Sequence, residues 1–75
     1  MDPQVAWDGL LEALTAKDWD DVREYATSLK GWLDRDGFPP MTIGTESLGR
    51  EWHTAIARLV CDHALAHVRA ANRVD

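Results

Sequence analysis

Hydrophobic and polar residues alternate with helical spacing from the first residues of the chain. At 100° per residue, four large apolar side chains of residues 3–15 share one side of a helix. They are Trp7, Leu10, Leu11 and Leu14. Asp2 is a suitable N-cap residue, and Pro3 suits the first helical position because its missing N–H has no partner there. The pattern predicts an amphipathic helix over residues 3–15.

The same spacing continues through residues 18–36. Their apolar residues fall within an arc of about 140°, and the charged residues occupy the rest of the circumference. The residues of the apolar arc are Trp19, Val22, Tyr25, Ala26, Leu29, Trp32 and Leu33. Asp18 is a suitable N-cap. Gly37 stands where a left-handed C-cap is expected, and Phe38-Pro39-Pro40 prevents continuation. We therefore expect a second helix over residues 18–36.

A third and longer helix is predicted over residues 45–72, beginning near Thr45 or Ser47. Its main apolar face comprises Leu48, Trp52, Ala55, Ile56, Leu59, Ala66 and Ala70. The connection before it contains three large apolar residues, Phe38, Met41 and Ile43, which we expect to cover one end of the core.

These elements predict an all-α fold and one helical domain over residues 1–75. Only two or three residues separate the first two helices, and so short a link produces an antiparallel helical hairpin. The longer third helix is expected to close this hairpin. Four tryptophans are expected to anchor the core: Trp7, Trp19, Trp32 and Trp52.

A second apolar row lies on the third helix, where residues follow one another at intervals of four, three and four. The row consists of Ala57, Cys61, Ala64 and Val68. The third helix should span about 40 Å, against roughly 20 and 27 Å for the other two, so its C-terminal turns are expected to extend past the hairpin. Small residues let another helix approach closely, which favours a partner surface or a homodimer. The alternative is that the third helix touches both hairpin helices and that the row belongs to the core.

His63 and His67 are four residues apart on the third helix, a spacing that can chelate a metal ion. Two ligands are too few for a zinc site, which takes three or four protein groups. His53 lies roughly 15 Å from His63 along the helix and cannot join them. A metal-binding homodimer that uses four imidazoles from two chains is therefore one hypothesis. Ordinary packing of both rings, with their nitrogens bonded to neighbours or water, is the other.

The remaining reactive residues do not form catalytic combinations. Cys61 and His63 point about 200° apart around the helix, so they cannot act as nucleophile and base. The carboxylates lie on solvated faces, where nothing raises their pKa values. We expect no enzyme, no cofactor and no small-molecule substrate. Gly31 is unusual inside a helix; close approach of another chain, a helix bend or tolerated drift would each explain it, and the sequence does not choose between them.

Charge and composition narrow the function further. The net charge is −5, and residues 1–40 hold nine acids against four bases. Without a basic stripe, direct nucleic-acid binding is not expected, although an acidic decoy that blocks a nucleic-acid-binding protein is a weaker alternative. No apolar stretch or signal-like start suggests a membrane segment or export, so a cytoplasmic location is expected. The sequence favours a non-enzymatic module for protein–protein interaction or self-association.

Overall fold

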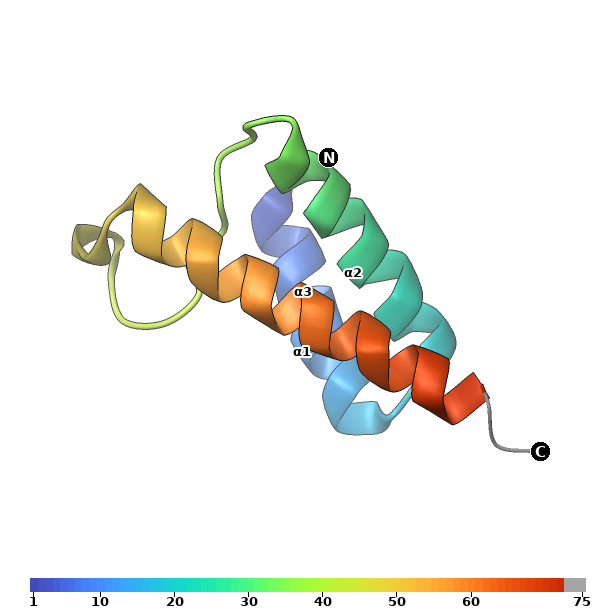
Figure 1. Cartoon of the computed structure of the whole chain (residues 1–75). Helices are drawn as coiled ribbons and strands as arrows, with labels where there is room; N and C mark the ends of the chain where they lie inside the picture. The colour runs from blue at the N-terminus through green and yellow to red at the C-terminus, as the bar shows by residue number, and fades with distance from the viewer. Residues whose placement is uncertain (73–75) are drawn as a thin grey trace.

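The computed structural model describes residues 1–72, and in this part of the chain every regular element is helical. Figure 1 shows two antiparallel helices with a third, longer helix crossing them. The elements are α1 (Pro3–Ala16), α2 (Trp19–Asp34), the 3-10 turn η1 (Glu46–Leu48) and α3 (Arg50–Asn72). The all-α fold and the α1–α2 hairpin are as predicted.

Local hydrogen bonds explain where α1 and α2 begin. The Asp2 carboxylate accepts a bond from the backbone N–H of Gln4 at 2.9 Å, and Asp18 accepts one from Asp21 at 3.4 Å. Both caps agree with the sequence analysis. The turn between the helices depends on Lys17, whose φ of 58° is left-handed.

The end of α2 differs from the prediction. Gly37 was expected to adopt the left-handed conformation, but Asp36 adopts it, with a φ of 60°. A Cβ atom at Gly37 would collide with the indole ring of Trp32. The Trp32 indole N–H donates to the Phe38 carbonyl at 2.7 Å. The glycine is therefore needed for the close approach of this ring.

The third helix begins at Arg50, three to five residues later than the predicted start near Thr45 or Ser47. Gly49 has a φ of 101°, which interrupts the helical conformation between η1 and α3. Leu48 consequently lies outside α3. The connection before η1 is bound to the helices by polar contacts, while Phe38, Met41 and Ile43 are exposed and do not cover the core as expected.

The core lies between α2 and the two helices that flank it. Its apolar residues are Ala6, Trp7, Leu10, Ala13, Val22, Ala26, Leu29, Leu33, Ala57, Cys61, Ala64 and Val68. Of the four tryptophans, only Trp7 is buried; Trp19 and Trp32 are half-buried, and Trp52 is exposed. The prediction that Trp52 anchors the core is therefore wrong.

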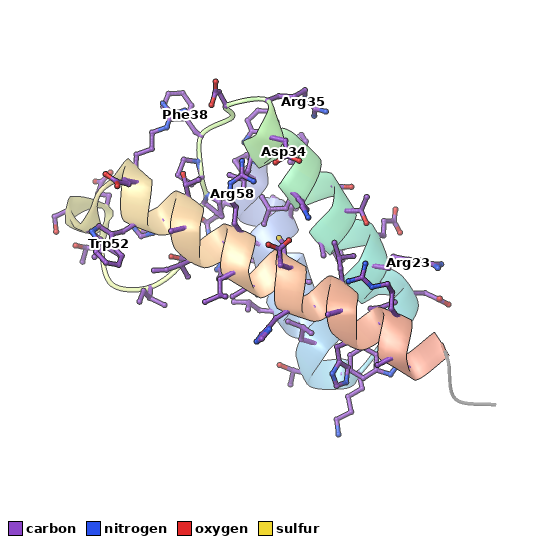
Figure 2. The ribbon with its side chains drawn as sticks, viewed as in Figure 1. Arg23, Asp34, Arg35, Phe38, Trp52 and Arg58 are labelled. Atoms are coloured by element: carbon purple, nitrogen blue, oxygen red, sulfur yellow. The ribbon has the colours of Figure 1, made fainter. Side chains whose placement is uncertain are left out.

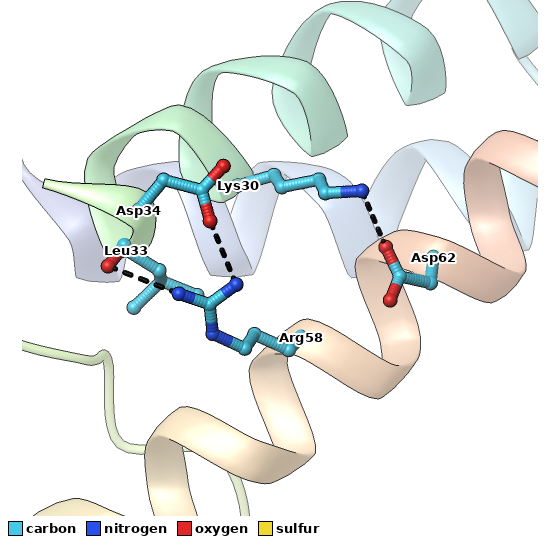
Figure 3. A network of polar contacts seen from close by, with 5 residues as sticks. All are labelled: Lys30, Leu33, Asp34, Arg58 and Asp62. Atoms are coloured by element: carbon cyan, nitrogen blue, oxygen red, sulfur yellow. Dashed lines mark hydrogen bonds and ion pairs between the residues drawn. The ribbon is translucent and has the colours of Figure 1, made fainter.

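Two ion pairs connect α3 to α2 (Figure 3). Lys30 Nζ lies 2.8 Å from the Asp62 carboxylate, and Arg58 lies 2.7 Å from Asp34. The Arg58 guanidinium also donates to the Leu33 carbonyl at 3.3 Å. Exposed pairs of this kind contribute little stability, and both lie between α3 and α2.

Candidate helix-packing surface on α3

The core side of α3 is the row of small residues, Ala57, Cys61, Ala64 and Val68. All four are buried, with exposed fractions of 0 to 3%. The sequence left open whether this row is a partner surface or part of the core; its burial places it in the core, so the partner-surface alternative is wrong. The C-terminal half of α3 does not extend past the hairpin but lies against it. Burial raises the pKa of the Cys61 thiol to about 11, so the thiol stays protonated at neutral pH.

A second apolar side of α3 points away from the hairpin. We call it the outer face and define it as Trp52, Ile56, Leu59, His63, Ala66 and Ala70. These residues follow at intervals of four, three, four, three and four, so they fall within about 80° around the axis. The centre of the outer face lies about 150° from the centre of the buried row. The spacing is that of the a and d positions along a coiled-coil seam.

Large side chains of the outer face are exposed. Trp52 and Leu59 are each 62% exposed. His63, Ala66 and Ala70 are exposed as well. Ile56 is half-buried and packs partly against the core. Figure 2 shows Trp52 beside the first turns of α3, away from the α1–α2 hairpin. Other large apolar side chains of the chain are also exposed, so this face is distinguished by the alignment of its exposed residues along one side of a helix.

A groove borders the C-terminal half of the outer face. Its volume is about 690 Å³, and its lining is mostly apolar. Leu14 at the end of α1 and Trp19 at the start of α2 form one wall, while Leu59 and Val60 belong to the other. The groove extends the apolar area beyond α3, toward the turn of the hairpin.

The two histidines of the predicted metal site have different surroundings. His67 packs against Trp19, with ring centroids 4.7 Å apart and planes tilted by 43°. His63 belongs to the outer face and is exposed. Within residues 1–72, no group of three or more His, Cys, Asp or Glu side chains is placed to hold a metal ion. A four-imidazole site across a dimer stays a prediction.

A third histidine has a structural role that the sequence analysis did not find. His53 is 4% exposed, and its Nδ1 accepts a bond from the backbone N–H of Thr42 at 3.0 Å. Nε2 is then the protonated nitrogen and donates to the Thr45 carbonyl at 3.1 Å. Gln4 holds the same connection from α1, since its side-chain amide makes bonds to both the N–H and the carbonyl of Met41. No local pattern signals these bonds, which join residues 8 to 37 positions apart.

Comparison of the chain with models of known protein families, with curated proteins and with solved structures finds no match. Among the described residues, no helix combines the length and the apolar character needed to cross a membrane. The outer face of α3 is the feature of the molecule on which a functional proposal can be based.

Proposed function

We propose that the protein is a non-catalytic interaction module that packs another helix against the outer face of α3. The observation that carries this proposal is the pair Trp52 and Leu59, both 62% exposed, in a row with coiled-coil spacing. A helix that is apolar on two sides contacts apolar groups on both sides. The hairpin satisfies one side of α3 and leaves the other available.

The energy available from this face is sufficient for association of modest strength. Burying the exposed part of Trp52 removes about 150 Å² from water, roughly 62% of a full Trp side chain. At about 25 cal/mol per Å², this contributes about 4 kcal/mol. Leu59 adds about 1–2 kcal/mol on the same scale. Association itself costs about 4–15 kcal/mol, so the roughly 5–6 kcal/mol from these two residues covers only the lower end of that range. Ile56 and the adjoining groove supply the surplus, which predicts a complex that dissociates on dilution.

The test replaces Leu59 by Glu, which places a charge at the middle of the outer face. The matched control is Val5→Glu, because Val5 on α1 is also 62% exposed but lies outside this face. Both variants should keep the helical circular-dichroism signal and the melting temperature of the wild type. Association is measured by sedimentation velocity of the purified protein, and by co-purification from the native host.

We expect Leu59→Glu to lose association and Val5→Glu to keep it. If both variants associate as well as the wild type, the outer face is not the binding surface. If Leu59→Glu unfolds the protein, the milder Leu59→Gln replaces it in the same comparison. Equal loss in both variants would mean that charge in general, and not this face, controls association.

A further inference from the structure

We infer that the helix packed on the outer face is α3 of a second copy, running antiparallel about a two-fold axis at the level of residue 61. This inference rests on the proposed function and adds the identity and orientation of the partner. It follows from the order of large and small residues along the outer face.

The outer face is bulky in its N-terminal half and narrow in its C-terminal half. Its six residues form three pairs that are equally distant from residue 61. The pairs are Trp52 with Ala70, Ile56 with Ala66, and Leu59 with His63. When two copies run antiparallel about residue 61, each pair becomes a contact layer, and an a position meets a d position as in antiparallel coiled coils. Trp52 and Ile56 then each face an alanine.

A parallel pair fits less well. It would place Trp52 against Trp52 at one end and Ala70 against Ala70 at the other. The two tryptophans would hold the helix axes apart, and a gap would remain between the two alanines. Such a gap removes favourable van der Waals contacts. The antiparallel arrangement keeps the distance between the axes even. It also opposes the two helix dipoles favourably.

Charge favours the meeting of two copies through α3 and not through the hairpin. Residues 1–40 carry nine acids and four bases, so two hairpins repel each other, whereas residues 41–75 carry four of each. Asp62 lies beside the outer face and near the proposed axis. Its charge is compensated within its own chain by Lys30, 2.8 Å away.

The surface area is consistent with a small dimer. The chain exposes 5154 Å², about 500 Å² more than the roughly 4,600 Å² that a compact monomer of 8.4 kDa exposes. A standard interface buries about 800 Å² per partner, which is more than this excess, so we expect a dimer weaker than an obligate one.

The inferred register separates this dimer from the zinc-bridged one. In an antiparallel pair, four imidazoles around one ion require His63 of one copy to face His67 of the other, which places the two-fold axis near residue 65. That axis lies four residues, or about 6 Å, from residue 61. The two dimers are therefore different structures, and the positions of contact distinguish them.

The experiment mixes two variants that each add one cysteine on the outer face to the buried Cys61, Ile56→Cys and Ala66→Cys, under mild oxidation. In the antiparallel dimer these two positions face each other, so a mixed disulfide should form. Two copies of residue 56 would be separated by about 15 Å along the axis, too far for a disulfide, and the same holds for residue 66. Wild-type protein is the control, since its own Cys61 is fully buried.

The two variants carry tags of different size, so non-reducing electrophoresis separates the mixed disulfide from the two same-variant disulfides. A mixed disulfide in at least tenfold excess over both same-variant products supports the inference. Same-variant products in excess indicate a parallel dimer and overturn it, although the outer face remains the binding surface. If neither product exceeds the wild-type background while Leu59→Glu still abolishes co-purification from the host, the partner is foreign. The inference then fails and the proposed function stands.

Discussion

Two glycines inside helices allow the same substitution to be tested in opposite surroundings. Gly9 lies in the middle of α1, and an added Cβ would lie 2.6 Å from the Tyr25 ring, which packs over it from α2. Gly31 lies in α2, where an added Cβ would meet only the end of Arg35, at 3.8 Å. Replacing each glycine by alanine changes the same atoms, so the difference between the two results measures the contact with Tyr25.

The expected magnitudes follow from two opposing effects. Alanine stabilises a helix interior by about 0.5–1 kcal/mol relative to glycine. Gly31→Ala should therefore raise the free energy of unfolding by about that amount. At Gly9 the gain is opposed by the shift of the Tyr25 ring, and overpacking of this kind costs about 1–3 kcal/mol. We expect Gly9→Ala to be less stable than Gly31→Ala by about 1–3 kcal/mol.

Urea denaturation followed by circular dichroism measures both variants. A double-mutant cycle provides the control, because Tyr25→Ala removes the ring that Gly9→Ala would displace. In the Tyr25→Ala background, Gly9→Ala should become stabilising, as at Gly31. If Gly9→Ala and Gly31→Ala stabilise the wild type equally, Tyr25 does not pack over α1 at this point, and the α1–α2 contact has been described incorrectly.

Three further predictions concern the core, a turn and an ion pair. Leu29→Ala should lower the free energy of unfolding by about 2–5 kcal/mol, because Leu29 is fully buried, and a loss below about 0.5 kcal/mol would contradict its place in the core. Lys17→Gly should raise the free energy of unfolding, measured by thermal unfolding, by about 1 kcal/mol, because the backbone of Lys17 is in the left-handed conformation. A destabilised variant would mean that the Lys17 side chain is needed. The hydrogen bond from Lys30 lowers the pKa of the Asp62 carboxyl, so its contribution to stability is present above the unfolded-state pKa and is lost as pH falls through the lower folded-state value. Asp62→Asn should therefore flatten the acid side of the pH–stability curve, and an unchanged curve would contradict the ion pair.

The sequence predicts those parts of the fold that depend on neighbouring residues. The start of α1 at Asp2 and of α2 at Asp18 depends on a side chain and backbone two or three positions away, so the local pattern is sufficient. The apolar arc of α2 is correct for the same reason: Val22, Ala26 and Leu29 are all buried. The helix period places these three residues on one side of α2, whichever element packs against that side.

Features that depend on distant residues are not predictable in this way. The end of α2 illustrates this, because Gly37 is needed to clear the ring of Trp32 while Asp36 adopts the left-handed conformation. Sequence alone assigns that conformation to the glycine, which adopts it at the lowest cost. Likewise, nothing near His53 in the sequence indicates that its ring bonds the backbone of Thr42 and Thr45.

The orientation of α3 shows a more general limit. Hydrophobic periodicity finds two apolar sides on this helix and ranks the outer face first, because tryptophan, isoleucine and leucine are more hydrophobic than alanine. Packing between helices also depends on size. A row containing Ala57, Cys61 and Ala64 lets the axis of α3 come close to the hairpin over residues 57–68, whereas Trp52 and Leu59 would hold it away.

The choice of the small side has a consequence for the outer face. Within residues 1–72, the small row is the side of α3 that packs into the core with the hairpin. The bulky residues are then left where no segment among the described residues covers them fully. Because bulky and small residues lie at equal distances on either side of residue 61, the face that this chain leaves open is complementary in shape to its own copy. The same difference in size that orients α3 within the fold therefore also specifies the proposed antiparallel partner.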